Sequence, residues 1–183
     1  EMVKMCSARP VVVTPEDGTF TPRFEEIERA VTSYTRAIIV NSPNNPSGLV
    51  YSRGLIGALV ALCEERGIHA IMDDIYHRLV FDGKKPISCY KYAKDLSESS
   101  KLIVINGASK QYAMTGFRIG WCIANRKLVE VMTNIQGQIT SCTALVSQAA
   151  AEGALNGLQS VVESLRMTIE NNCAVMMTEL GAF

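Results

Sequence analysis

The sequence has 183 residues, with 18 basic and 18 acidic side chains, so its formal net charge is zero. Hydrophobic residues make up 48% and charged residues 20%, a composition typical of a folded globular protein and not of a disordered chain. The balanced charge gives no basic surface for nucleic acid, and the longest apolar run, at 55–63, is about half of a membrane span. We therefore expect neither nucleic acid nor a membrane as a partner.

Short apolar runs alternate along the chain with segments of helical period. Among the predicted helices, the one at 52–66 has the clearest ends, because Ser52 is a suitable N-cap and Gly67 is a suitable C-terminal stop. The predicted strands lie at 10–14, 37–40, 68–72, 102–105 and 119–124, and the predicted helices at 22–31, 52–66, 144–155 and 158–180, within a mostly helical region from 127 onward.

Continuously apolar strands that are separated by helices favour an α/β fold of doubly wound topology, with a mostly parallel sheet covered by helices on both faces. In such folds, ligands bind at the carboxyl ends of the strands. Here the predicted strands are followed by an Asn/Pro turn at 41–48, by Asp73 and Asp74, and by a segment that leads to Lys110. We therefore expect these polar groups to converge at one edge of the sheet.

The cysteines and histidines do not form a recognisable site. Six cysteines are present without a C-x-x-C pair, which favours reduced thiols in a cytoplasmic protein over a disulfide framework. The two histidines, His69 and His77, lack the spacing of metal ligands, so no metal site is expected. His69 is interpreted as a packed strand residue, and the role of His77 stays open.

Each candidate residue, considered alone, could have more than one role. A carboxylate such as Asp73 at the end of a buried strand could pair with a cationic ring nitrogen, or it could cap a turn. Lys110 could form an imine with a carbonyl, or it could be a solvated loop lysine. Tyr76 is close enough in sequence to serve the same ligand as Asp73, and Arg118 is suited to bind a phosphate with its planar fork.

The order and spacing of these residues carry more information than any one of them. Asp73 lies 28 residues after Asn45, Lys110 lies 37 after Asp73, and Arg118 lies 8 after Lys110. With the stretches NSPNNPSG at 41–48, IMDDIY at 71–76 and GASKQYAMTGFRIG at 107–120, the chain closely resembles the class I/II pyridoxal-phosphate-dependent aminotransferases of fold type I, in the aspartate and aromatic aminotransferase branch. His77 departs from the glutamate that is common at this position in the family.

The resemblance implies a role for each matched residue. Lys110 would carry pyridoxal 5'-phosphate as an internal aldimine and then act as the base, and Asp73 would pair with the pyridine nitrogen. Tyr76 and Asn45 would hydrogen-bond the phenolic oxygen of the cofactor, and Asn45 would also help to orient the substrate. Ser109 and Arg118 would bind the phosphate. Lys110, Asp73 and Tyr76 are thus the expected catalytic residues.

The resemblance also implies an activity and a larger protein. We expect transfer of an amino group between an L-amino acid, with aspartate as the leading donor, and a 2-oxo acid; a carbon–sulfur β-lyase or a non-catalytic fragment are the alternatives. Residues 1–155 would form the central and later part of the cofactor-binding large domain, without its first strands, and 156–183 a helix toward an absent small domain. The 183-residue chain alone would be incomplete and inactive, and the full protein a homodimer.

Overall fold

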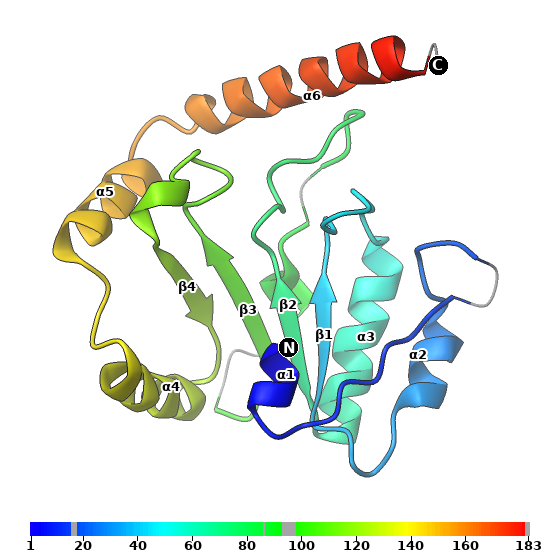
Figure 1. The fold of residues 1–183 in the computed structure, drawn as a ribbon. Coiled ribbons are helices and arrows are strands. Elements are labelled where there is room, and N and C mark those ends of the chain that lie inside the picture. The colour runs from blue at the N-terminus through cyan, green and yellow to red at the C-terminus, as the bar shows by residue number, and fades with distance from the viewer. Residues whose placement is uncertain (16–17, 86, 93–97, 182–183) are drawn as a thin grey trace.

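The computed structural model describes residues 1–15, 18–85, 87–92 and 98–181. At its centre is a four-stranded sheet in which the spatial order of the strands, β1-β2-β3-β4, is the same as their order in the chain (Figure 1). β1 (Ala37–Asn41), β2 (His69–Asp73) and β3 (Leu102–Gly107) are parallel, whereas β4 (Gly120–Ile123) runs antiparallel to β3. The prediction of an α/β fold with a mostly parallel sheet is confirmed.

Helix α3 (Arg53–Arg66) connects β1 to β2 and has the ends that the sequence predicts. The Ser52 hydroxyl accepts a hydrogen bond of 3.1 Å from the Leu55 N–H at the first turn. Gly67 ends the helix in the left-handed region, at φ +66°, where a residue with a Cβ would be strained. The start of α3 is therefore set by the Ser52 cap, and its end by the left-handed conformation of Gly67.

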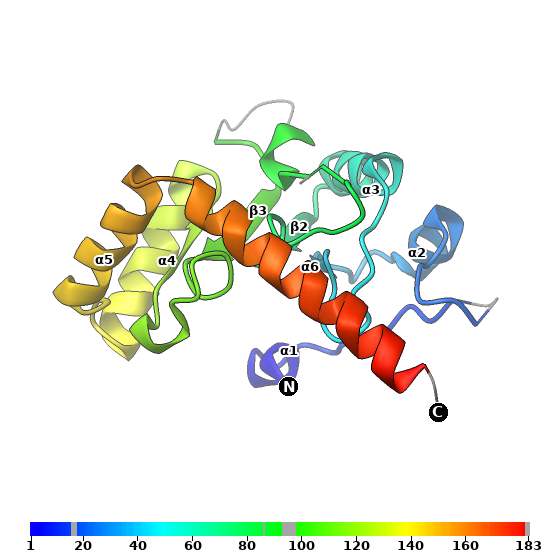
Figure 2. The same ribbon diagram turned by 90° about the horizontal axis from the view of Figure 1, so that it is seen from above.

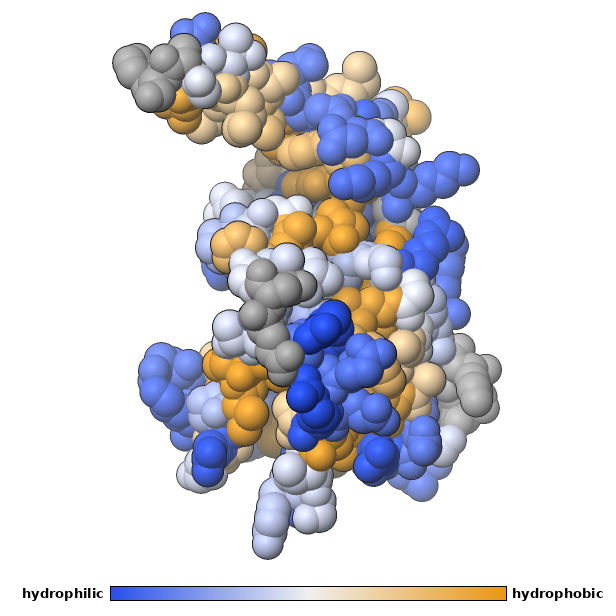
Figure 3. All heavy atoms as spheres, turned by 90° about the vertical axis from the view of Figure 1, so that its right-hand side faces the viewer, coloured by the Kyte–Doolittle hydropathy of each residue, from blue (hydrophilic) through white to orange (hydrophobic). Residues whose placement is uncertain are grey.

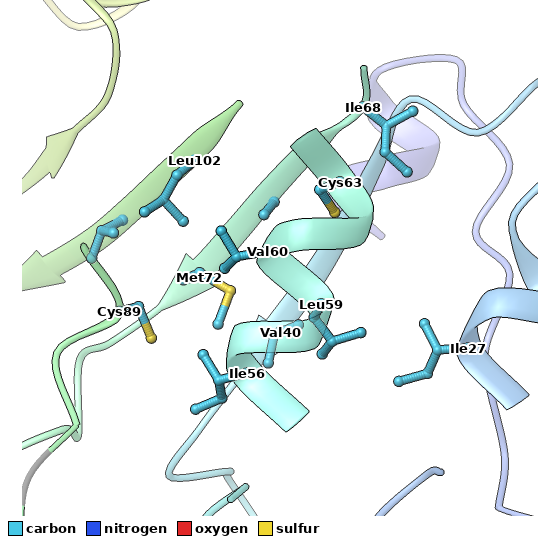
Figure 4. Packing of buried hydrophobic residues seen from close by; sticks show 12 residues of the cluster. Ile27, Val40, Ile56, Leu59, Val60, Cys63, Ile68, Met72, Cys89 and Leu102 are labelled. Atoms are coloured by element: carbon cyan, nitrogen blue, oxygen red, sulfur yellow. The ribbon is translucent and has the colours of Figure 1, made fainter. Parts of the chain in front are cut away.

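The hydrophobic core lies between α3 and one face of the sheet (Figure 4). Ile56, Leu59 and Val60 of α3 are each 1% exposed and pack in one cluster with Val40 and Met72 from the strands. This cluster is extended by side chains of helix α2 (Phe24–Ala30) and of the short helix η1 (Cys89–Tyr92). Burial of these apolar side chains fixes α3 against the strands that carry the polar residues at their ends.

The opposite face of the sheet is more open. Ile39 of β1 and Ile105 of β3 are 56% and 41% exposed, whereas Val40 and Val104, which belong to the core cluster on the α3 face, are 6% and 2% exposed. Figure 3 shows hydrophobic side chains at the surface on the side of the molecule that carries α2 and the outer edge of β1. In the described part of the chain, helices therefore pack more closely against the α3 face of the sheet than against the opposite face.

The predicted strand at 10–14 is wrong. This segment is irregular and pairs with no strand among the described residues, and Val11 and Val12 are 63% and 83% exposed. A run of valines favours an extended backbone, but only a neighbouring ladder satisfies its N–H and C=O groups. The segment instead lies beside α2, where Val12 and Val13 line a cavity of about 310 Å³.

The last part of the chain is helical, as predicted, and consists of α4 (Arg126–Ile139), α5 (Leu145–Asn156) and α6 (Ser160–Leu180). α6 runs above the carboxyl ends of β1–β3 in both ribbon views (Figures 1 and 2). Its beginning is held by Gln159, whose Oε1 accepts hydrogen bonds from Arg78 at 2.6 Å and from Tyr112 at 2.9 Å. Two short helices, α1 (Met2–Met5) and η2 (Thr115–Phe117), complete the described elements.

Among the residues that the structure describes, no helix combines the length and the apolar character needed to cross a membrane.

Candidate active site

The predicted site residues follow strands that end at the same edge of the sheet (Figure 1). Asn41 at the end of β1 is paired in register with Asp73 at the end of β2, and Asp73 is paired with Ile105 of β3. The loops that leave these three strands carry Asn45, Tyr76 and Lys110, respectively. Parallel pairing is therefore the reason why residues far apart in the sequence come together here.

The turn at 41–48 is organised by Asn41. Its Oδ1 accepts the Asn45 N–H at 2.9 Å, and its Nδ2 donates to the Asp73 carbonyl oxygen at 3.3 Å. The Asn45 side chain then reaches Tyr76, with 3.4 Å between Nδ2 and the phenolic oxygen. The structure thus brings Asn45 and Tyr76 into contact. Asn41, which sequence reasoning did not single out, links the first two loops.

Asp73 keeps one carboxylate oxygen available for a ligand. Its Oδ1 accepts the N–H of Ile75 at 3.2 Å, which bends the chain directly after β2. Its Oδ2 makes no hydrogen bond to any residue that the structure describes, and the side chain is half-buried. One oxygen of Asp73 therefore stabilises a turn, and the other is available to meet a cation.

Lys110 lies over Tyr76. Its Nζ is 5.7 Å from the centroid of the Tyr76 ring, within the range of a cation–π contact, and the lysine has no ion pair in the described ranges. A half-buried amine without a carboxylate partner can meet a carbonyl group at this edge. Lys110, Tyr76 and Asn45 thus form a chain of contacts at the ends of three strands.

Ser109 and Arg118 are at the border of this group. Ser109 is half-buried and directly precedes Lys110, but no described contact joins its hydroxyl to the other predicted residues. Arg118 is exposed, adopts φ +51° after η2, and donates from Nη1 to the Thr115 carbonyl at 3.0 Å. The remaining guanidinium N–H groups are free to bind an anion within the part of the chain that is described.

Asp74, the neighbour of Asp73, is 1% exposed and is held by Cys89, which is also 1% exposed. Burial raises the pKa of the Asp74 carboxyl, while hydrogen bonds from the Cys89 thiol and N–H act in the opposite direction. Burial and the adjacent Asp74 charge also raise the pKa of the Cys89 thiol. Asp74 is therefore a structural residue beside the site, and the raised pKa disfavours the reactive thiolate form of Cys89.

Polar side chains before and after Lys110 were missed by sequence reasoning. Gln111 is 3% exposed and donates from Nε2 to the Gly107 carbonyl at 3.1 Å, which closes the loop that presents the lysine. Asn106 accepts the Gly107 N–H at 2.7 Å through Oδ1. The signal for both was their position on either side of the Gly107–Lys110 loop.

Outside this site, the described residues offer no second group of reactive side chains. A cavity of about 530 Å³ at the amino-terminal end of β1 and β2 is lined by residues that include Arg36, Arg66 and His69, and by none of the predicted site residues. Among the described residues, no cluster of three His, Cys, Asp or Glu side chains could hold a metal ion. All six cysteines are free. The carboxyl edge of the sheet is therefore the place where the reactive groups converge.

Comparisons with known proteins identify the family to which this chain belongs. The profile of the family described as "Aminotransferase class I and II" matches residues 1–182. The chain is 34% identical to the aspartate aminotransferase of Bacillus subtilis over 98% of its own length, and 38% identical to the aspartate/prephenate aminotransferase of Nitrosomonas europaea over 87%. It covers 46% and 40% of those relatives, so it spans less than half of their length.

Solved structures show the same relationship. The aspartate aminotransferase of Rhizobium meliloti superposes with a TM-score of 0.89 at 31% identity, over 100% of this chain and 46% of that one. The aspartate aminotransferase of Thermus thermophilus with maleate superposes with a TM-score of 0.87 at 31% identity, over 99% and 47%. Because the family profile covers nearly the whole chain and the fold agrees throughout, this chain belongs to the class I and II aminotransferase family, with the architecture of fold type I.

Proposed function

We propose that the complete protein is a pyridoxal-phosphate-dependent aminotransferase, which transfers an amino group between an L-amino acid and a 2-oxo acid. The observation that carries this proposal is the placement of Lys110 over Tyr76, with Asn45 in contact with the tyrosine and the free oxygen of Asp73 at the same edge. Aspartate is the proposed amino donor, since the relatives named above are aspartate aminotransferases and one aspartate/prephenate aminotransferase.

The chemistry of the available side chains fits the cofactor. Pyridoxal phosphate offers a carbonyl, a ring nitrogen, a phenolic oxygen and a phosphate. Lys110 Nζ would bind at the carbonyl, Asp73 Oδ2 at the protonated ring nitrogen, and Tyr76 with Asn45 at the phenolic oxygen. Ser109 and Arg118 would hold the phosphate. Each of these groups has a polar atom that is not used by a described neighbour, save that Asn45 and Tyr76 share one long contact of 3.4 Å.

Each residue then has a defined task. When bound, the cofactor supplies an electron sink for the negative charge that develops at the α-carbon of the substrate. The Asp73 carboxylate keeps the ring nitrogen protonated, because a nearby negative charge favours the cationic form. Lys110 Nζ would take and return the proton at the α-carbon. The Tyr76 hydroxyl and the Asn45 amide hold the phenolic oxygen in place.

The reaction is tested on the complete protein with aspartate and 2-oxoglutarate. We expect oxaloacetate to form, and we expect Lys110→Ala to abolish both this activity and the visible absorbance band of the bound cofactor. Lys84→Ala is the matched control, because the Lys84 side chain is 59% exposed and its ion-pair partner, Asp82, lies 3.9 Å away. Formation of pyruvate from cystathionine without oxaloacetate would instead support a β-lyase.

We also propose the wider setting of this site. Residues 1–155 would belong to the cofactor-binding large domain, and 156–183 would lead toward a second, smaller domain. The complete protein would be a cytoplasmic homodimer, an inference that rests on the family and on the free thiols of all six cysteines. Light scattering on the complete protein measures the dimer directly, and a monomeric mass would contradict it.

A further inference from the structure

His77 lies where two loops of the site meet. It follows Tyr76 in the turn after β2, and its Nδ1 is 2.9 Å from Nδ2 of Asn106, near the end of β3. Asn106 precedes Lys110 by four residues, and the contact joins positions that are 29 residues apart. The imidazole thus connects the loop of Asp73 and Tyr76 with the loop of Lys110.

The orientation of the Asn106 amide is fixed by its other contacts. Its Oδ1 accepts the Gly107 N–H at 2.7 Å and lies 3.4 Å from Nε2 of the buried Gln111. Turning the amide over would place its NH₂ group against these two donors. The Asn106 NH₂ group therefore faces His77, and the imidazole must accept the hydrogen bond.

This geometry selects one form of the imidazole. Nδ1 also lies 2.9 Å from the Asp74 carbonyl oxygen, but that oxygen already accepts the backbone N–H of His77 at 3.0 Å. A single ring nitrogen can donate to the carbonyl or accept from the amide, not both. Because the Asn106 NH₂ group needs an acceptor and the Asp74 carbonyl oxygen already has one donor, the geometry favours the imidazole form with its proton on Nε2 and a lone pair on Nδ1.

We propose that His77 is a positioning residue for Lys110: its Nδ1 holds the Asn106 amide, and Asn106 holds the Gly107 backbone from which the lysine loop starts. The catalytic part of this inference rests on the proposed function. The structural part of the inference is that His77 Nδ1 accepts a hydrogen bond from Asn106, and this part is independent of the proposed function. A displaced lysine would slow proton transfer more than it would weaken binding of the amino acid.

The test uses the complete protein and a pair of variants at one position. His77→Ala removes the acceptor, whereas His77→Asn places a carbonyl oxygen where Nδ1 stands. We expect His77→Ala to lower kcat about tenfold with little change in KM for the amino donor, and to shift the pH midpoint of the cofactor absorbance band. We expect His77→Asn to recover most of both, and His77→Ala/Asn106→Ala to lose no more than Asn106→Ala alone, because His77 acts through Asn106.

A second readout needs neither activity nor cofactor. The ¹⁵N spectrum of the His77 ring should show an unprotonated Nδ1 and a protonated Nε2 in the cofactor-free protein. A protonated Nδ1, or a His77→Asn variant as impaired as His77→Ala, would overturn the inference. If the wild-type protein lacks aminotransferase activity, the proposed function fails, and the ring spectrum still decides the His77–Asn106 contact.

Discussion

Cys89 satisfies both oxygens of the buried Asp74 carboxylate: its thiol donates to Oδ1 at 2.9 Å, and its backbone N–H donates to Oδ2 at 3.1 Å. Asp74 directly follows the proposed cofactor ligand Asp73, and its own N–H donates to the Ile105 carbonyl at 2.8 Å. The pair therefore anchors the end of β2 to the core, and it does so through a carboxylate that is removed from solvent.

Replacement of Cys89 should reveal the value of the thiol hydrogen bond. Cys89→Ala leaves Oδ1 without its donor, so we expect the free energy of unfolding to fall by about 1–3 kcal/mol. Cys89→Ser keeps a donor of similar size and should lose less. Urea unfolding of both variants measures the difference, and equal losses would show that packing of the sulfur, not its hydrogen bond, stabilises this region.

The same pair predicts a pH dependence. Burial raises the pKa of Asp74 above its ordinary value of 3.8, so the stability that this group contributes is complete below that value. It is lost as the pH rises through the pKa of the folded state, because the folded form then carries a buried charge. Cys89→Ala removes a hydrogen bond that lowers this pKa, so the stability of the variant should fall more steeply with rising pH than that of the wild type.

Urea unfolding between pH 4 and pH 7 measures this pH dependence in both proteins. Asp74→Asn carries no titratable group at this position, so in its presence Cys89→Ala should no longer change the pH dependence of stability. A pH dependence that stays the same in Cys89→Ala and in the wild type would contradict the assignment of the buried charge to Asp74.

Gly107 is required by close approach of the β3 and β4 backbones. A Cβ at this position would lie 2.9 Å from the Ile119 carbonyl oxygen and 3.2 Å from Cα of Gly120. We expect Gly107→Ala to lower the free energy of unfolding by about 1–3 kcal/mol. Gly153→Ala is the control, since nothing lies within 4 Å of its Cβ and alanine favours α5; it should raise stability by about 0.5–1 kcal/mol. Thermal melting compares the two, and an equal effect would contradict the crowding.

Gln159 should control the docking of α6. Its Nε2 donates to the carbonyls of Ala154, Leu155 and Gly157, while its Oε1 accepts from Arg78 and Tyr112. We expect Gln159→Ala to speed hydrogen exchange at the start of α6, with a loss of about 1–3 kcal/mol. Gln148→Ala, which removes one exposed contact to the Thr143 carbonyl, should have little effect. Unchanged exchange in Gln159→Ala would mean that other contacts hold α6, such as the hydrogen bond of 2.7 Å from the Asp82 N–H to Glu170.

Asp73→Asn tests the charge at the proposed ring-nitrogen site. Asparagine can still accept the Ile75 N–H, but it lacks the negative charge that keeps a ring nitrogen protonated. We expect kcat to fall about 10²–10³-fold with the fold intact. Asp82→Asn, at an exposed position, is the control, and an Asp73→Asn variant with normal kcat would remove Asp73 from the proposed mechanism.

The sequence predicted those elements whose ends have local chemical causes. Ser52 and Gly67 mark α3 because capping depends on neighbours in the chain, and the apolar runs of β1 to β3 match the observed strands within one or two residues. The segment at 10–14 was wrongly predicted as a strand, because a run of valines gives the same sequence pattern whether or not a neighbouring strand is present. The antiparallel direction of β4 could not be predicted either, because an apolar run looks the same whether the strand is parallel or antiparallel to its neighbour.

The site was predictable to a similar extent. The types and spacing of Asn45, Asp73, Tyr76 and Lys110 were sufficient to place them at one edge. The contacts that orient them were not, because Asn41, Asn106 and His77 act through hydrogen bonds between positions that are 29 or 32 residues apart. Such bonds depend on the register of the strands, which fixes which loop ends face one another.

The identity of chain order and strand order has a consequence for biosynthesis. Within the described sheet, each strand pairs with the one made just before it, so during translation every new strand emerges to find its partner already present. The aspartate-bearing end of β2 is in place before the lysine loop leaves the ribosome, and β3 can join β2 without displacing any strand of that sheet. A nascent chain of which β4 has left the ribosome should therefore already bring the reactive groups together.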